Sequence, residues 1–344
     1  MKKLKYLSIF SLPLTVAIAF NLEGWWTFLP VIVFFGLVPL IELFSTPDLT
    51  NISLHEKELV AKDPFYDALL FLMVFVQFAF LAWFLYLCAS GSVNANWVGR
   101  VTAMGCMCGI IGINIGHELG HRNERWHRFM GDLLMFTSLE NHFTPYHNSG
   151  HHHNVATPED PATARRNEPV FVFWIRSQLG SYFQAWSIEM RRLRIVGNPP
   201  LHWRNKMLQY TFFHAVFLAS VFILLGGFAL TSFLLAAAFG ILLLETVNYI
   251  EHYGLLRRKR ENGTYERVKR IHSWNSNHVV GRVVLFELTR HSDHHYKPDR
   301  PYQLLESHEE SPIMPTGYPG MMLLALVPPL FFRVMNKRID EISA

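Results

Sequence analysis

The sequence has few charged residues for its length. Asp, Glu, Lys and Arg make up 17% of the 344 residues, below the roughly 25% that is typical of soluble domains. Half of the residues are hydrophobic, and 28 of them are phenylalanine. Because the charge deficit comes from long apolar runs, the composition is typical of a protein that spans a membrane.

Cysteine is also rare. The three cysteines, Cys88, Cys106 and Cys108, all lie in apolar runs and form no Cys-x-x-Cys pair. This excludes a zinc ribbon or a cysteine-bound iron–sulfur cluster carried by this chain. We expect the three side chains to be small buried hydrophobic groups.

Six apolar segments are each close to the ~20 residues that a helix needs to cross the hydrocarbon core. They run over about 6–20, 25–44, 68–89, 97–116, 208–228 and 230–249. The first resembles a signal peptide, but no convincing small-x-small cleavage site follows it, so we expect a retained span. A shorter apolar segment, 321–335, contains two prolines and is expected to be an interfacial or buried helix. The sequence therefore predicts an all-α integral membrane protein with six transmembrane helices.

The positive residues predict the orientation. The loops at 21–24, 91–96 and 226–227 contain no Lys or Arg, whereas the N-terminus, the stretch 122–206 and Arg257–Arg260 are rich in them. Since cytoplasmic loops carry the excess of Lys and Arg, both termini and the polar segments are expected in the cytoplasm. The predicted organisation is 1–116 with four spans, 117–207 as a cytoplasmic segment, 208–250 with two spans and 251–344 as a cytoplasmic segment.

Histidines gather in the segments predicted to be cytoplasmic. The stretch 146–165 begins Tyr-His-Asn-Ser-Gly-His-His-His and contains His147, His151 and His152. On an α-helix, residues four apart share a face, which brings His147 and His151 together. Imidazole is the commonest side-chain metal ligand, so a metal site is favoured over a solvated histidine-rich loop.

A second cluster reads His117-Glu118-Leu119-Gly120-His121. His-Glu-x-x-His is also the signature of zinc peptidases, with the glutamate as general base, so an intramembrane zinc protease is an alternative. A catalytic zinc needs only three protein ligands, and more histidines follow, at His252 and in Arg290-His291-Ser292-Asp293-His294-His295.

The candidate ligands are nine in total, too many for one ion of coordination number four to six, whereas two ions fit. They are His117, His121, His147, His151, His152, His252, His291, His294 and His295. All-imidazole sites suit zinc, copper, iron or nickel, so the spacing alone does not identify the metal. Candidates for orienting the imidazoles by hydrogen bonds, each of which is alternatively a solvated polar group, are Glu118, Asn248, Glu251 and Asp293.

These motifs together resemble the alkane 1-monooxygenase family of membrane diiron enzymes. The resemblance rests on His-Glu-Leu-Gly-His-Arg, Tyr-His-x-x-Gly-His-His, Ala-Thr-Pro-Glu-Asp-Pro-Ala-Thr-Ala-Arg, Asn-Tyr-x-Glu-His-Tyr-Gly and Arg-His-Ser-Asp-His-His in this order. It implies a centre of two iron ions held by the nine histidines. It also implies hydroxylation, by O2, of the terminal methyl group of medium- or long-chain alkanes.

The resemblance further implies electrons from rubredoxin and its NAD(P)H-dependent reductase, and a place in the bacterial inner membrane; no nucleic acid partner is expected. An arginine-rich face is expected to steer the acidic donor, although the positive-inside rule explains it equally well: Arg165, Arg166, Arg191, Arg192 and Arg194. Two positions depart from the family pattern. Tyr146 replaces the usual glutamate, and Thr289 replaces the usual glutamine.

Other functions stay open at this stage. A hydroxylase or desaturase of another apolar substrate, such as a fatty acid, an aryl methyl compound or a prenol, is the nearest alternative. A metal transporter or sensor is the alternative that is not an enzyme. Four further histidines are weaker ligand candidates, because single histidines are more often structural: His142, His153, His272 and His278.

Overall fold

The computed structural model describes residues 2–343, and its regular elements are all helices. Within this range the β-structure is limited to two isolated bridges, Lys259 with Tyr265 and Asn275 with Ile313. The predicted all-α class is therefore confirmed. The chain divides into two compact units, which are described separately: Met1–Val33, Phe65–Tyr146 and Tyr182–Leu244 form the first, and Phe34–Pro64, His147–Ser181 and Glu245–Ala344 form the second.

Five helical segments in the described range are long and apolar enough to cross a membrane. They are Lys3–Asn21, Gly24–Phe44, Phe65–Cys88, Ala95–Gly120 and Lys206–His252. The first four agree with the predicted spans to within a few residues. The prediction of six separate spans is not confirmed, because the segments expected at 208–228 and 230–249 fall in one helical element, α12 (Lys206–His252).

α12 is interrupted where the sequence predicts a connection between spans. Gly226 has φ 84° and ψ 173°, a backbone conformation that is essentially restricted to glycine. The element therefore consists of two helical halves that meet at this residue.

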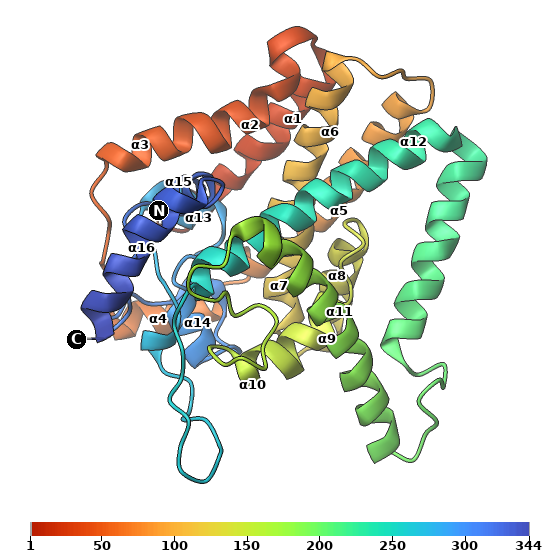
Figure 1. Cartoon of the computed structure of the whole chain (residues 1–344). Helices are drawn as coiled ribbons and strands as arrows, with labels where there is room; N and C mark the ends of the chain where they lie inside the picture. Colours follow the sequence, from red (N-terminus) through yellow and green to blue (C-terminus); the bar gives the residue numbers. More distant parts are fainter. Residues whose placement is uncertain (1, 344) are drawn as a thin grey trace. The chain divides into compact units, whose positions relative to one another are not determined.

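The first unit contains a layer of helices packed side by side. α1 (Ser11–Asn21), α2 (Leu29–Ile32) and α6 (Ala95–Met107) contact one another (Figure 1), and α5 (Phe65–Cys88) packs against α6. The three cysteines are buried, as predicted. Gln77, the single polar residue of the third predicted span, is also buried and donates a hydrogen bond to Thr137 Oγ1 at 3.0 Å.

A close approach of two backbones holds the helix that carries the first histidine cluster. α7 (Asn114–Gly120) follows a π-helical turn, Cys108–Ile113, and packs against α8 (Arg125–Phe136). A Cβ atom on Gly131 would lie 2.8 Å from the carbonyl oxygen of Gly116. Only glycine permits this contact, which fixes α7 against α8.

The second unit contains the other histidine clusters. α3 (Val38–Phe44) packs against α13 (Val279–Val284) and α15 (Tyr318–Ala325) (Figure 1). The buried Glu42 on α3 accepts a hydrogen bond of 2.7 Å from the backbone N–H of Gly281. The remaining helices of the chain are α4 (Leu54–Lys62), α9 (Phe143–Tyr146), α10 (His152–Asn154), α11 (Val170–Ile195), α14 (His291–Tyr296) and α16 (Pro328–Ser343).

The apolar segment 321–335 differs from its prediction in one respect. We expected one short helix, and the structure has two, α15 and α16, with α16 beginning at Pro328. Proline is readily accommodated at the start of a helix and disrupts its interior, so the prolines separate the two helices. Neither is among the candidate membrane spans, and Phe331 and Met335 of α16 are buried.

Candidate metal centre

A π-helical turn determines how the histidines of the 146–165 stretch are arranged. Residues His147–His151 form this turn, and α10 continues from His152. In a π-helix the hydrogen bonds join residues five apart instead of four. The Nε2 atoms of His147 and His152 consequently lie 3.0 Å from each other. The rings of His147 and His151 lie close together, as expected, with centroids 5.0 Å apart, but the ligand atom of His151 belongs to a different group.

Four buried imidazoles converge in the second unit. Their ligand atoms lie within 4.8 Å of one another, and we call them the four-histidine group: His151, His252, His291 and His295. The Nε2 atom of His295 lies 3.2 Å from that of His151 and 2.9 Å from that of His291, whose Nε2 lies 3.0 Å from that of His252. Each of the four side chains is at most 4% exposed.

The three-histidine group, also in the second unit, adjoins the four-histidine group. It consists of His147, His152 and His294, whose ligand atoms lie within 4.8 Å of one another. The rings of His152 and His295, one from each group, have centroids 4.5 Å apart. α14 contributes to both groups, because His291 and His295 are one helical turn apart and His294 points elsewhere. This helix ends at Tyr296, just before Pro298, as the sequence predicts.

The remaining two predicted ligands lie in the first unit. The Nε2 atoms of His117 and His121, one turn apart at the end of α7, are 3.0 Å from each other. The neighbouring Glu118 carboxylate forms an ion pair with Arg122 at 2.9 Å, and Arg122 also contacts Asp67 at 3.3 Å. We call His117 and His121 the His117–His121 pair.

The residues of the two groups fit bound metal ions. At a metal–nitrogen distance of about 2.1 Å, adjacent ligands of an octahedral ion are ~3 Å apart, close to the nitrogen–nitrogen distances of 2.9–3.2 Å found here. Burial lowers the pKa of His294 to about 3 and that of His295 well below its usual range. Both imidazoles are therefore neutral at pH 7, which is the form that binds metal.

Asp160 orients one ligand and was missed in the sequence. Its Oδ2 lies 2.9 Å from Nδ1 of His151 and also accepts a hydrogen bond of 2.7 Å from the hydroxyl of Thr163. A carboxylate in this position fixes the tautomer and ring orientation of a metal-binding histidine. Asp160 lies in Thr-Pro-Glu-Asp-Pro, within one of the motifs that carry the family resemblance.

Glu251 is the predicted acid that reaches the four-histidine group. One carboxylate oxygen lies 3.2 Å from Nε2 of His291, and the other accepts a hydrogen bond of 2.8 Å from the hydroxyl of Tyr318. Burial, together with the nearby Glu251, raises the pKa of Tyr318 well above its usual range, so the phenol keeps its proton and donates. Asn248, a further candidate, forms a side-chain hydrogen bond with Glu245.

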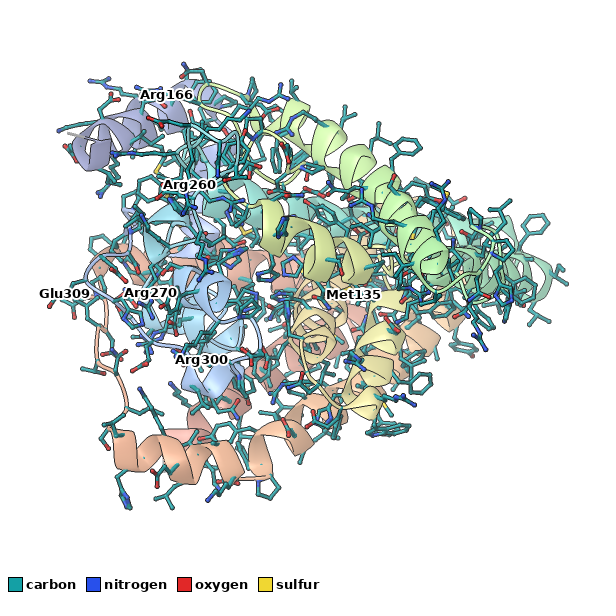
Figure 2. The ribbon with its side chains drawn as sticks, turned by 90° about the horizontal axis from the view of Figure 1, so that it is seen from below. Met135, Arg166, Arg260, Arg270, Arg300 and Glu309 are labelled. Carbon is teal, nitrogen blue, oxygen red and sulfur yellow. The ribbon has the colours of Figure 1, made fainter. Side chains whose placement is uncertain are left out.

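Asp293 holds α14 in place through contacts with basic side chains. Its fully buried carboxylate pairs with Arg270 at 3.3 Å, with Arg300 and with His308 at 3.0 Å, and accepts the backbone N–H of Glu306 at 3.1 Å. Figure 2 shows Arg270 and Arg300 beside the blue α14. These contacts fix the helix on which His291, His294 and His295 lie.

The weaker candidates and the two departures from the family pattern lie outside these groups. Among the residues that the structure describes, His142, His153, His272 and His278 are in neither group. Tyr146 is buried in the first unit, where its ring contacts that of Phe143. The hydroxyl of Thr289 donates a hydrogen bond to the carbonyl of Ser276.

Comparisons with known proteins agree with this geometry. Residues 95–323 match the family model for fatty acid desaturases. The chain is 38% identical to an alkane 1-monooxygenase of Ectopseudomonas oleovorans, covering 98% of this chain and 86% of the relative. It is 39% identical to alkane 1-monooxygenase 1 of Alcanivorax borkumensis, over 92% and 79%. It is 32% identical to the xylene/toluene monooxygenase hydroxylase component of Pseudomonas putida, over 70% and 63%. The chain belongs to the fatty acid desaturase family of membrane proteins, in the group that contains the alkane 1-monooxygenases.

Proposed function

We propose that the protein hydroxylates the terminal methyl group of medium- or long-chain alkanes and produces 1-alkanols. The observation that carries this proposal is the pair of adjoining imidazole groups in a chain that matches alkane 1-monooxygenases over nearly its whole length. A methyl C–H bond offers no polar handle, so the substrate is held by apolar contacts. The bilayer is its source.

Nine histidines are proposed to bind two iron ions. The four-histidine group holds one ion and the three-histidine group holds the second, and His117 and His121, in the first unit, are the remaining proposed ligands. Iron suits imidazole ligands, and it supplies the redox chemistry that O2 requires and zinc lacks. Asp160 fixes the ring of His151, and Tyr318 holds Glu251 against His291.

The reaction consumes O2, two electrons and two protons for each alkane, and yields one alcohol and one water. The sequence contains no cysteine motif for a cluster of its own, so an external donor provides the electrons. We propose rubredoxin, reduced by its NAD(P)H-dependent reductase. The chain is proposed to cross the bacterial inner membrane six times, with the two halves of α12 as separate crossings and the histidines on the cytoplasmic side.

Turnover with labelled oxygen tests the proposal. The purified protein, in lipid nanodiscs with octane, rubredoxin, reductase and 18O2, is expected to contain two iron ions per chain and to form 1-octanol that carries the label. An alkene, or an alcohol without label, would contradict hydroxylation. One zinc ion and no iron would support a hydrolase instead.

A second substrate class has specific support. The similarity to the xylene/toluene monooxygenase component favours aryl methyl groups as competitors of alkanes. Rates with octane and with para-xylene, measured side by side, distinguish the two. We expect octane to give the higher kcat/KM.

A further inference from the structure

A positively charged hairpin follows the last ligand of α12. Residues 257–269 turn back on themselves, with Lys259 bridged to Tyr265, and we call them the basic hairpin. Figure 1 shows this segment as a long loop that extends away from α14. It contains two acidic residues, Glu261 and Glu266, and six basic ones: Arg257, Arg258, Lys259, Arg260, Arg267 and Lys269.

Most of this positive charge is available to a partner. Lys269 is paired with Glu266 at 2.6 Å. In contrast, four exposed cations of the hairpin have no carboxylate within ion-pair distance in the described part of the chain: Arg258, Lys259, Arg260 and Arg267. Figure 2 is viewed from the side toward which the hairpin extends, and it labels Arg260.

The arginine face expected from the sequence is partly neutralised by comparison. Arg166 forms two hydrogen bonds with the carboxylate of Asp340, at 2.7 and 2.9 Å. Arg192 is paired in the same way with Glu189, both bonds being 2.8 Å long. A paired cation contributes less to the long-range field that steers an acidic partner.

The basic hairpin is hydrogen-bonded to the segment that follows His152. Arg257 donates one hydrogen bond of 2.8 Å from its side chain to the carbonyl of His153, and another of 2.7 Å from its backbone to the carbonyl of Ala156. A cavity of about 500 Å³ lies between the two segments, and its lining includes His152 of the three-histidine group, Tyr265 and Arg267. Arg257 and Arg267 line this cavity together with Glu159 and Glu266, so the cavity opens to His152 beside the exposed cations of the basic hairpin.

We propose that the basic hairpin is the docking surface for the acidic protein that donates electrons, and that this protein sits over the cavity beside His152. The proposal deepens the proposed function and rests on it. Electron transfer requires a short path, which the cavity wall provides, and opposite charges accelerate the encounter. An anionic membrane surface would also attract these cations, but it accounts for neither the cavity nor its contact with a ligand.

Charge reversal tests the assignment. The variant K259E/R260E and the matched control R191E/R194E, which change the charge equally, are assayed in nanodiscs of neutral or of anionic lipid, with rubredoxin as the donor, at low and high ionic strength. We expect the hairpin variant to lose at least about tenfold in kcat/KM for rubredoxin at low salt, mainly through KM. The difference should narrow at high salt, where screening weakens the attraction, while the control stays within about twofold of the wild type.

Two further measurements separate the possible failures. Iron content and anaerobic reduction by dithionite, followed by Mössbauer spectroscopy, should be unchanged in both variants, because a small reductant needs no docking surface. A hairpin variant with wild-type kcat/KM, an equal loss in the control, or a loss seen only with anionic lipid would overturn the proposal. If rubredoxin fails to reduce the wild type, the proposed donor is wrong. If rubredoxin reduces the wild type and the hairpin variant equally well, the proposed donor is retained and the proposed docking site is wrong.

Discussion

The two imidazole groups of the second unit differ in how completely the protein encloses them. The four-histidine group is buried throughout and has two carboxylates against it, Asp160 at His151 and Glu251 at His291. The three-histidine group includes the half-buried His152, which lines the cavity under the basic hairpin. A closed site holds its ion firmly, whereas an open site admits other reactants. We therefore expect the four-histidine group to retain its proposed ion and the three-histidine group to admit reactants.

Removing a ligand from each group is the most severe test of this comparison. His291→Ala removes a ligand that contacts two others, so we expect loss of the ion and a fall in turnover well beyond the roughly 100-fold that outer changes cause. His152→Ala should weaken one ion only and leave about one iron per chain. Metal analysis by mass spectrometry and octane turnover measure both. Full activity in His291→Ala would show that the ligand set is wrong.

Two buried aspartates allow a finer comparison. Asp160→Asn removes the carboxylate that orients His151, so metal affinity and activity should fall about 10–100-fold with a small change in thermal stability. Asp293→Asn instead removes the carboxylate that Arg270 and Arg300 share, while Glu310 and Glu306 remain as their other partners. We expect a loss of about 1–3 kcal/mol from the unsatisfied buried contacts and near-normal iron content in the protein that remains folded.

Thermal unfolding and iron content, measured on the same samples, distinguish the roles of these aspartates. If Asp160→Asn lost stability and kept its iron, its hydrogen bond to His151 would be structural. If Asp293→Asn lost iron without losing stability, Asp293 would act on the ligands directly.

Tyr318→Phe tests whether the hydrogen bond from Tyr318 to Glu251 positions Glu251 beside the four-histidine group. The substitution removes the hydrogen bond to Glu251 and costs about 1 kcal/mol of stability. We expect a loss of roughly tenfold in activity, as for other groups that orient ligands, and a change in the Mössbauer spectrum, since Glu251 faces His291. A Tyr253→Phe variant, which loses the hydrogen bond to Asn336 and the one accepted from the backbone N–H of Asn167, is the control. Identical spectra for wild type and Tyr318→Phe would contradict the positioning role.

Much of this architecture could be predicted from the sequence. The spans are long apolar runs, and hydrophobicity alone determines them. Three of the four segments with candidate ligands were also recognisable, because imidazoles repeat in them at spacings that place two on one helical face; the fourth contains His252 alone. The sequence predicts a break between the last two spans, and the structure has a kink there, at Gly226. Hydropathy does not encode the backbone conformation of one residue, so the form of the break could not be predicted.

The division of ligands between the groups could not be predicted. It depends on the π-helical turn at His147–His151, which pairs His147 with His152, and the sequence shows only the α-helical spacing. The role of Asp160 depends on chain folding that brings its carboxylate back to His151. Asp293 was expected beside the imidazoles, yet its neighbours include Arg270 and Arg300, which come from separate segments.

Glu266, in the basic hairpin beside the more exposed three-histidine group, provides the test with the smallest expected effect. The hydrogen bonds from Lys269 and from the backbone N–H of Arg258 lower its pKa from 4.5 to about 2. Since the folded pKa is depressed, this stabilisation is complete above about pH 4.5 and is lost as the pH falls toward 2. Hydrogen exchange of residues 257–269, corrected for intrinsic rates, should therefore be constant from pH 8 to 5 and rise below that range. Glu266→Gln should raise the exchange modestly between pH 8 and 5, where Glu266 is charged, and remove most of the rise at lower pH. His272 lies 3.5 Å from Glu266, and a rise in exchange between pH 7 and 6 would identify that imidazole, instead of Glu266, as the group that controls the hairpin.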